Sequence, residues 1–192
     1  MLRALRAIDR ADVALLLVDA VEGVTDQDAH IASYILEEAK GVVIVVNKWD
    51  LIVKDAHTVD WYTQHIRESL KFIPYAPILF VSAKTKEGVD QVLEVALRVR
   101  EERLRRIPTG ELNRMVSEAV VRHAPPSKAG KRLKFYYVTQ AAVDPPTFLF
   151  FVNDPRLMHF SYQRYLENRL RRSFGFDGTP LRLVFKARGE RC

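Results

Sequence analysis

The sequence predicts an α/β protein in two parts: a parallel sheet covered by helices on both faces, followed by a small α+β domain with the element order αββαβ. Strand-like apolar runs alternate with helical patterns over the first 106 residues. Those runs are apolar on both faces, which is typical of a parallel sheet buried between helices. Beyond residues 105–110 the order changes, because a helix is followed by two β-type runs in succession.

The first part, residues 1–106, contains three predicted strands and three predicted helices. The strands are the apolar runs at residues 13–18, 42–46 and 78–81. The helical patterns cover residues 25–40, 57–70 and about 89–104. The first of these helices opens at Thr25, and Asp28 three residues later is the partner that completes a capping box. Apolar residues then recur at helical spacing, which supports the assignment.

The second part, residues 107–192, follows a break that contains a proline and a glycine. Its predicted elements are a helix at about 111–123, strands at 133–139 and 147–152, a helix at about 160–174 and a strand at 181–185. The turn signal Val143-Asp144-Pro145-Pro146 separates the first two strands. We therefore expect a three-stranded sheet with two helices.

The charge is distributed unevenly between the two parts. Residues 1–106 carry 15 Lys and Arg against 17 Asp and Glu, whereas residues 107–192 carry 15 against 7. A basic second part joined to a balanced first part suggests that only the second part meets an anionic polymer. The alternative is a basic surface that faces only solvent.

Composition disfavours several classes of protein. No apolar run approaches the roughly 18–20 residues of a membrane span, and residues 1–10 form an amphipathic basic segment unlike a secretory signal. The single cysteine, Cys192, cannot form an internal disulfide, and no Cys/His spacing indicates zinc. We expect a cytoplasmic protein with no membrane partner, no DNA partner and no metal ligands.

Polar residues directly follow two of the predicted strands. Asn47-Lys48-Trp49-Asp50 comes after the second strand, and Ser82-Ala83-Lys84 follows the third. Ligands of open parallel sheets bind at the carboxyl ends of the strands, so we expect these residues to form one site. The carboxylate of Asp50 can accept hydrogen bonds from both the ring N–H and the exocyclic amine of guanine, a donor pair that adenine lacks. The pattern therefore predicts guanine binding.

The remaining residues of the predicted guanine site have complementary roles. We expect Lys48 to lay its methylene stem on the face of the base, Asn47 to tie the two loops together, and the backbone N–H of Ala83 to meet the guanine oxygen. Ser82 and Lys84 complete the set. On its own, N-K-x-D is an ordinary loop sequence. After a buried strand, and followed about 35 residues later by strand-Ser-Ala-Lys, it is the guanine-recognition signature of translation-factor-type GTPases.

Over nearly its whole length the chain resembles the bacterial double-GTPase Der (EngA) family. Residues 2–13, 19–20, 22–25 and 46–51 look like the family's second GTPase domain. Its C-terminal KH-like domain is matched by residues 136–137, 139–140, 145–148, 151–153, 159–162, 164–171, 174–176 and 178–180. The resemblance implies a partial P-loop-GTPase-type sheet and a KH-like domain. It also implies binding of GTP or GDP, with Mg²⁺ in the complete family, and a role in ribosome biogenesis with the large ribosomal subunit and its RNA as partners.

The phosphate-binding motif of this class is missing from the sequence. Its consensus, G-x-x-x-x-G-K-[ST], fails at Gly130-Lys131, because Pro125 and Arg132 occupy the flanking positions. No D-x-x-G motif precedes the first strand. We expect no catalytic residue, no magnesium ligand and no GTP hydrolysis by this chain alone, since phosphoryl transfer depends on those parts.

Two alternatives follow from the missing motif. The chain is expected to be a fragment that keeps only the guanine-recognition half of the GTPase domain. It is alternatively an inactive truncation product, or a non-catalytic RNA- or ribosome-binding module whose guanine motif is only inherited. Residues 13–18 would then form an unpaired apolar edge strand, and such an edge favours self-association.

Six cations of the second part are predicted to face RNA or the ribosome. They are Lys131, Arg132 and Lys134, which we expect on a loop, and Arg164, Arg171 and Arg172 on the polar side of the helix at 160–174. The aromatic runs at 135–137 and 148–151 are expected to pack in the core, with RNA stacking as the alternative. The sequence Gly175-Phe176-Asp177-Gly178 matches the G-x-x-G of RNA-clamping loops, but we expect a turn there.

Overall fold

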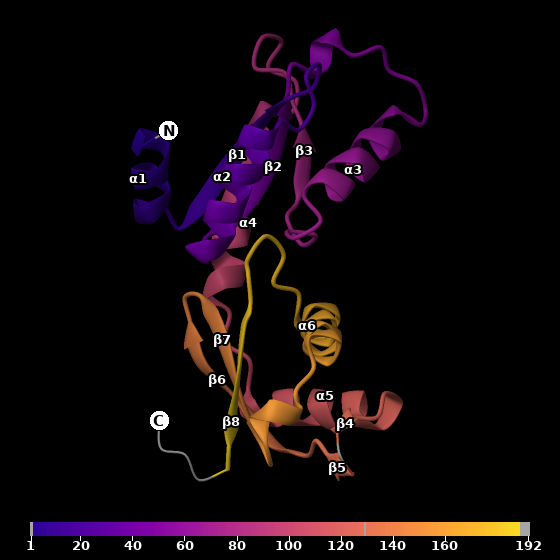
Figure 1. Cartoon of the computed structure of the whole chain (residues 1–192). Coiled ribbons are helices and arrows are strands. Elements are labelled where there is room, and N and C mark those ends of the chain that lie inside the picture. Colours follow the sequence, from indigo (N-terminus) through magenta and orange to yellow (C-terminus); the bar gives the residue numbers. More distant parts are fainter. Residues whose placement is uncertain (1, 129, 189–192) are drawn as a thin grey trace. The chain divides into compact units, whose positions relative to one another are not determined.

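The computed structural model describes residues 2–128 and 130–188, so Cys192 lies outside the described residues. The chain forms two compact units (Figure 1). The first unit ends at Arg103 and also includes Asp177–Pro180. The second contains Leu104–Phe176 and resumes at Leu181. No helix in residues 2–128 and 130–188 is long and apolar enough to cross a bilayer.

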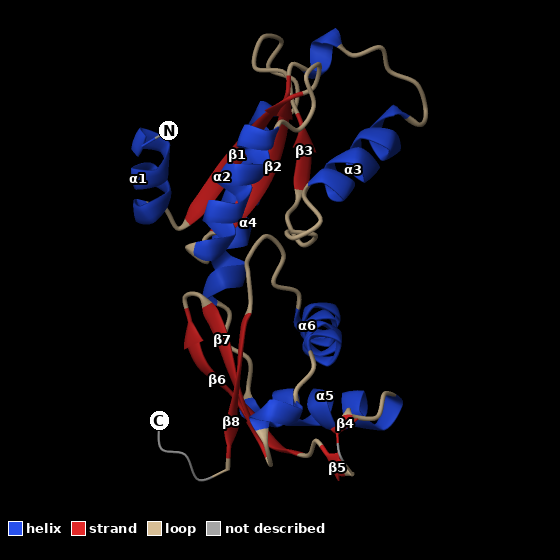
Figure 2. Cartoon of the chain, viewed as in Figure 1, coloured by secondary structure: helices blue, strands red, loops and turns tan. Residues whose placement is uncertain are grey.

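The first unit is built on a three-stranded parallel sheet (Figure 2). Its strands are β1 (Val13–Asp19), β2 (Gly41–Asn47) and β3 (Ile78–Phe80), in the order β1-β2-β3. Asp19 lies beside Asn47, and Val46 beside Phe80. This register confirms the predicted parallel sheet and brings the carboxyl ends of all three strands to one edge.

Helices α1 (Leu2–Arg10), α2 (Asp26–Glu37), α3 (Thr58–Ser69) and α4 (Val89–Leu104) accompany the sheet. The capping box predicted at the start of α2 is present. The backbone N–H of Thr25 donates to Oδ2 of Asp28 over 2.9 Å, and the N–H of Asp28 donates to Oγ1 of Thr25 over 3.2 Å. These two bonds satisfy helix-start donors that have no partner within the helix, and they fix where α2 begins after β1.

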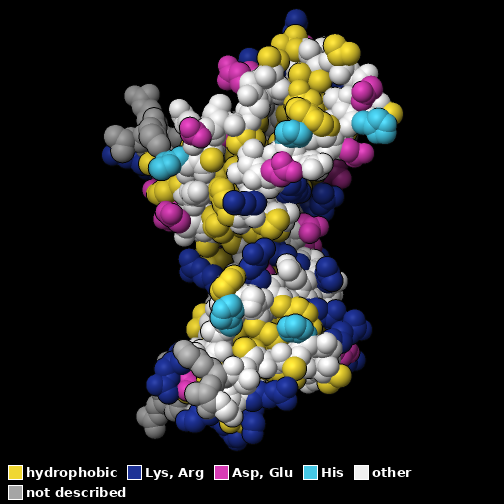
Figure 3. Space-filling view, turned by 45° about the vertical axis from the view of Figure 1, so that its right-hand side comes forward, with side chains coloured by type: hydrophobic (Ala, Val, Ile, Leu, Met, Phe, Trp, Pro, Cys, Tyr) yellow, Lys and Arg dark blue, Asp and Glu magenta, His cyan; other side chains and the backbone are white. Residues whose placement is uncertain are grey.

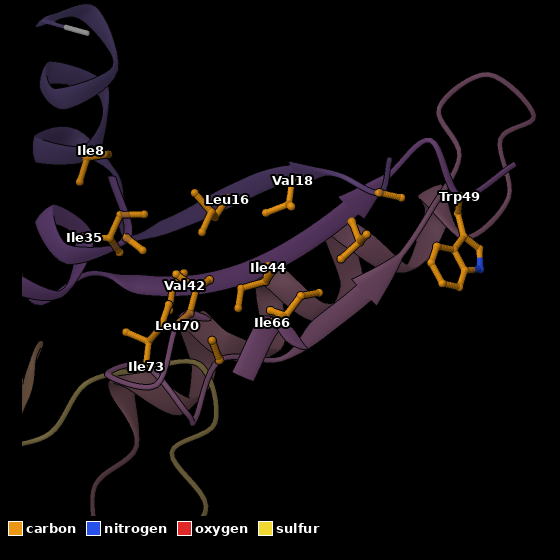
Figure 4. Close-up of a cluster of buried hydrophobic side chains, with 14 residues drawn as sticks. Ile8, Leu16, Val18, Ile35, Val42, Ile44, Trp49, Ile66, Leu70 and Ile73 are labelled. Carbon is orange, nitrogen blue, oxygen red and sulfur yellow. The ribbon is translucent and has the colours of Figure 1, made fainter. Parts of the chain in front are cut away.

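Strand β2 is buried on both faces, as its unbroken apolar run predicted. Val42, Ile44 and Val46 pack into one cluster, and Figure 4 shows Val42 and Ile44 beside side chains such as Ile35 and Leu70. On the opposite face, Val43 and Val45 pack with Val81, Val95 and Val99. The two clusters confirm that helices cover both sides of the sheet.

Strand β1 is an edge strand. Within the described residues it pairs with β2 alone, so the predicted unpaired edge is present. Alternate side chains of β1 differ in burial: Leu16 and Val18 lie in the core, whereas Leu15 is 43% exposed and Leu17 58% exposed. An edge with free backbone groups and exposed leucines is a surface on which another strand can pair.

The second unit has the predicted αββαβ order. Its elements are α5 (Thr109–Arg122), β6 (Phe135–Val143), β7 (Pro146–Val152), α6 (Phe160–Phe174) and β8 (Arg182–Ala187), with a short 3₁₀ turn, η2 (Pro155–Leu157), before α6. The sheet order is β6-β7-β8, with β7 antiparallel to β6 and parallel to β8. Phe148 and Phe150 of β7 are fully buried against Leu166 and Leu170 of α6.

Two predictions for this unit are wrong in detail. Lys131 and Arg132 lie on β5 (Lys131–Arg132), which pairs antiparallel with β4 (Ser127–Lys128), and not on a loop. Tyr136 and Tyr137 are each 45% exposed and so lie only half in the core. The reason is a shift in strand register between Phe135 and Tyr137, because a β-bulge interrupts the alternation of side chains between the two faces.

The segment Gly175–Gly178 is a turn, as predicted. Phe176 is fully buried and packs on Phe148, with ring centroids 5.6 Å apart, so it does not project as a clamp loop would. The adjoining segment Asp177–Pro180 groups with the first compact unit. Hydrogen bonds explain this grouping: Gly178 accepts from the N–H of Val42 over 2.7 Å and donates to the carbonyl of Tyr75 over 2.9 Å.

Candidate nucleotide-base site

The carboxyl ends of the strands bring all six predicted base-binding residues to one edge of the first sheet. Asn47 ends β2, and Lys48 and Asp50 follow it, with Asp50 in the short 3₁₀ turn η1 (Trp49–Leu51). Ser82, Ala83 and Lys84 come just after β3. Backbone bonds fix the two segments against each other: Trp49 N–H donates to Val81 O over 3.0 Å, and Val81 N–H to Val46 O over 2.8 Å.

Asn47 joins the two loops, as predicted. Its Oδ1 accepts a hydrogen bond from the backbone N–H of Ala83 over 3.0 Å. We had expected this N–H to meet a guanine oxygen, but the structure gives it to Asn47, the acceptor already placed beside it. A base oxygen at this point would have to share the N–H or displace the Asn47 amide. The bond to guanine stays a prediction.

Asp50 is held as a charged acceptor. The hydroxyl of Ser82, a fully buried residue, donates to Oδ1 of Asp50 over 2.6 Å. This bond is the main reason why the pKa of Asp50 lies below its ordinary value, and the nearby charges of Lys84 and Lys54 act in the same direction. Since an ionised carboxylate has about four acceptor positions, the group can still accept two further donors while Ser82 holds its orientation.

Lys48 has an anchor that the sequence did not reveal. It occupies the left-handed region of backbone conformation, with φ 64° and ψ 30°. Its ammonium group forms an ion pair with Asp19, whose side chain is only 19% exposed. Lys48 lowers the pKa of Asp19, and the N–H of Val21 adds a hydrogen bond to the same carboxylate over 2.8 Å. Asp19 therefore adds a further polar side chain at the strand ends, contributed by β1.

The buried side chain of Trp49 anchors the loop that carries Lys48 and Asp50. It is 4% exposed although both of its neighbours, Lys48 and Asp50, are more open to solvent. Its ring lies 4.4 Å from that of Phe80 and meets Tyr62 edge to face at 5.0 Å. A buried indole between two polar residues locks the loop onto the sheet, which holds the amide and the carboxylate in a fixed orientation.

A magnesium site cannot be assigned to these residues. Within residues 2–128 and 130–188, no group of three or more His, Cys, Asp and Glu side chains is arranged to hold a metal ion. Asp19 and Asp50 are each committed to a donor within the protein.

Five of the six predicted cations of the second unit are exposed: Lys131, Arg132, Lys134, Arg164 and Arg172. Figure 3 shows Lys and Arg side chains over much of the visible surface of this unit, where Asp and Glu side chains are few. Arg171 differs from the other five. It is 15% exposed, pairs with Glu167 over 2.8 Å and donates to the carbonyl of Phe176 over 2.8 Å. Its guanidinium group stabilises the end of α6.

Comparison with known families first defines the class. A model described as the elongation factor Tu GTP binding domain matches residues 2–102. A second model, described as the KH-domain-like region of EngA bacterial GTPase enzymes, C-terminal, matches residues 106–186. The chain thus matches a GTP-binding domain of the translation-factor type over residues 2–102 and a KH-like domain over residues 106–186.

Curated relatives define the particular family. A protein named GTPase Der from Moorella thermoacetica is 55% identical over 191 residues, which are 100% of this chain and 44% of the relative. GTPase Der from a Thermoanaerobacter species is 54% identical over 190 residues, 99% of this chain and 43% of the relative. The chain belongs to the Der (EngA) family of bacterial GTPases, and it spans less than half the length of these relatives.

Solved structures are more distant. The crystal structure of a point variant of Aquifex aeolicus Era bound to GDP.AlF4- aligns with 95% of this chain and 67% of its own, at 19% identity and a TM-score of 0.43. This similarity is too low to support an inference about the site.

Proposed function

We propose that the first unit binds the base of GTP or GDP at the carboxyl ends of β2 and β3. The observation that carries this proposal is the carboxylate of Asp50, oriented by a hydrogen bond from the buried Ser82 beside a loop that Asn47 ties to Ala83. Asp50 accepts the ring N–H and the exocyclic amine of guanine. A site built on such specific hydrogen bonds discriminates against a base that lacks one of them.

The two lysines flank the base in this proposal. The ion pair with Asp19 leaves the methylene stem of Lys48 as an apolar surface for the ring. Lys84 is exposed and contributes positive charge near Asp50. Neither residue belongs to a phosphate-binding loop, so base contacts alone give an affinity near millimolar, about −4 kcal/mol. We propose that these residues recognise the nucleotide and do not hydrolyse GTP.

The experiment compares GDP with inosine diphosphate, which lacks the exocyclic amine. The full chain is titrated with each nucleotide, and amide chemical shifts of residues 47–50 and 82–84 are followed. We expect wild type to prefer GDP, and Asp50→Ala to bind both nucleotides equally weakly. Asp60→Ala removes an exposed carboxylate in the first turn of α3 and serves as the matched control. Equal affinity of the wild type for the two nucleotides would count against the proposal.

We propose further that the second unit contacts ribosomal RNA of the large subunit through exposed cations at β5 and α6. This proposal is supported by the net charge of the second part and by the exposure of Lys131, Arg132, Lys134, Arg164 and Arg172. Arg171 is left out of this surface because Glu167 already engages it. The role in ribosome biogenesis and the cytoplasmic location belong to the same proposal.

Co-sedimentation with large ribosomal subunits at two salt concentrations tests this RNA-binding role. Each phosphate contact adds to the salt dependence of binding, so higher salt should release the chain. Binding to subunits without measurable GDP binding would favour a non-catalytic RNA-binding module. No binding of either kind would favour an inactive chain.

Self-association through residues 13–18 is a separate proposal. It is supported by the edge position of β1 and the exposure of Leu15 and Leu17. Light scattering over a range of concentrations is the test, since a chain that stays monomeric at all of them does not pair along this edge.

A further inference from the structure

The first unit contains a polar cavity at the opposite end of β3 from the candidate base site. Its volume is about 260 Å³, and its lining includes residues 74–77 in the segment between α3 and β3. Figure 1 shows the course of that segment. Pro77, which lines the cavity, directly precedes β3, whereas Ser82 and Ala83 follow that strand. The cavity is therefore separate from the base site, and the two share no residue.

The walls of the cavity are held in place by backbone contacts. The carbonyl of Tyr75 accepts a hydrogen bond from Gly178 over 2.9 Å, and the carbonyl of Pro77 accepts one from Ile44 over 2.9 Å. Val99 of α4 forms another part of the lining and is 1% exposed. Gly178 lies so close to Val99 that an added Cβ would be 2.4 Å from its Cγ2 atom. The backbone of the walls is therefore fixed by contacts within the first unit.

Arg67 gives the cavity its chemistry. Its Nη1 atom is buried and has no hydrogen-bond partner among the described residues. Burial lowers the pKa of Arg67, and no acidic neighbour contributes to the shift. A guanidinium group nevertheless stays charged in proteins. A buried N–H of a charged group that lacks an acceptor costs free energy, so the site favours a ligand that supplies one.

The charges around Arg67 indicate the sign of that ligand. Arg98 adds a second cation to the lining, and Asp177 is the one carboxylate among the described residues that line the cavity. The net charge of the lining is therefore positive. Two guanidinium groups match the geometry of phosphate or carboxylate oxygens, because each can donate two parallel N–H bonds.

We propose that this cavity binds the oxyanion group, phosphate or carboxylate, of a small molecule. Nη1 of Arg67 is covered by protein atoms in the structure, so the Arg67 side chain turns towards the cavity and Nη1 then donates to one oxygen, while Arg98 donates to another. The volume lies just below the range of about 300–1,000 Å³ for drug-sized ligands. The ligand is correspondingly small, and any apolar portion lies against Pro74 and Pro77.

The experiment titrates the full chain with inorganic phosphate, and separately with malonate, at constant ionic strength. We expect saturable amide shifts at residues 75, 76, 98 and 99 and none at Ser82 and Ala83. Arg67→Gln should weaken binding at least tenfold. Lys71→Gln removes the same charge from an exposed residue outside the lining and should bind as the wild type does. A response to phosphate alone identifies a phosphorylated ligand, and a response to malonate alone a carboxylate.

Two further variants keep the proposal falsifiable if Arg67→Gln fails to fold. Arg98→Gln should weaken binding of the oxyanion. Asp177→Asn should tighten its binding, because the substitution removes a negative charge that repels the oxyanion. The proposal is overturned if no saturable shift occurs, if Arg67→Gln and Lys71→Gln respond alike, or if Asp177→Asn weakens binding. Because GDP is absent from the titration, this outcome is independent of the proposed base site.

Discussion

The polar groups at the strand ends of the first unit and the cations of the second unit are organised in different ways. At the strand ends the side chains hold one another: Asn47 bonds Ala83, Ser82 bonds Asp50, and Asp19 pairs with Lys48. On the second unit, Lys131 and Arg132 are exposed side chains of a short hairpin. The first arrangement fixes the direction of each donor and acceptor, which suits recognition of one base. The second supplies positive charge without fixed geometry, which suits contact with a nucleic-acid backbone.

The strongest test of this difference is a substitution that removes the buried packing beneath the polar groups at the strand ends. Trp49→Ala deletes a buried indole and should destabilise the first unit by about 3–5 kcal/mol, since Phe80 and Tyr62 lose their packing partner. The second unit should keep its own unfolding transition. Denaturant unfolding followed by NMR signals from each unit is the measurement.

Trp61→Ala is the matched control for this prediction. Trp61 is 54% exposed on α3 and its ring meets only the neighbouring rings of Tyr62 and His65 among those described, so its removal should cost about 1 kcal/mol, well below the cost of Trp49→Ala. A cost for Trp61→Ala equal to that for Trp49→Ala would mean that the loop after β2 does not depend on the buried ring.

A second prediction concerns the charge surface. Replacing Lys131, Arg132 and Lys134 together by Gln should lower the salt dependence of RNA binding. For a single-stranded RNA the slope of log K against log salt should fall by about 2, at roughly 0.7 per phosphate contact. Arg171→Gln should leave the slope nearly unchanged, because its guanidinium group is paired with Glu167. If the triple substitution changes affinity but not the slope, these cations do not contact phosphates.

A third prediction concerns the hydrogen bond between Asn47 and Ala83, which joins the two loops and does not involve the carboxylate of Asp50. Asn47→Ala removes the acceptor for the N–H of Ala83 and should cost about 1 kcal/mol. The Ala83 amide should exchange its hydrogen faster than in the wild type. Asn47→Asp keeps an oxygen that can accept the bond and should restore slow exchange. Unchanged exchange in Asn47→Ala would show that the bond does not restrain the second loop.

Sequence patterns predicted one of the two contacts that depend on strand ends, and they missed those that depend on how distant segments fold back. The tie from Asn47 to Ala83 follows from the rule that parallel strands end together. The ion pair between Asp19 and Lys48 follows from the same geometry, since Asp19 ends β1. It was missed because one aspartate after an apolar run is a weak signal.

Other features could not be read from local patterns. The exposure of Tyr136 and Tyr137 results from a bulge, which depends on the partner strand as much as on β6. The grouping of Asp177–Pro180 with the first unit depends on Gly178 fitting against Val99. The cavity at Arg67 is formed by segments about 110 residues apart in the sequence, and no spacing rule connects them.

The smallest expected effect concerns the ionisation of Asp50. In the folded chain its pKa lies below the ordinary value of 3.8, mainly because of the Ser82 hydroxyl. A carboxyl whose folded pKa is depressed adds stability that is fully present above the unfolded pKa and is lost as pH falls through the folded pKa. Ser82→Ala removes the donor, so the folded pKa should rise towards the ordinary value and this acid-sensitive contribution should shrink. Carbon-13 NMR of the Asp50 carboxyl between about pH 2 and pH 6 measures the shift directly.

The same titration of Asp19, whose main partner is Lys48, provides an internal reference that Ser82→Ala should not move. A pKa of Asp50 that is equal in the two proteins would mean that Ser82 positions the carboxylate without stabilising its charge, and base recognition would then rest on geometry alone.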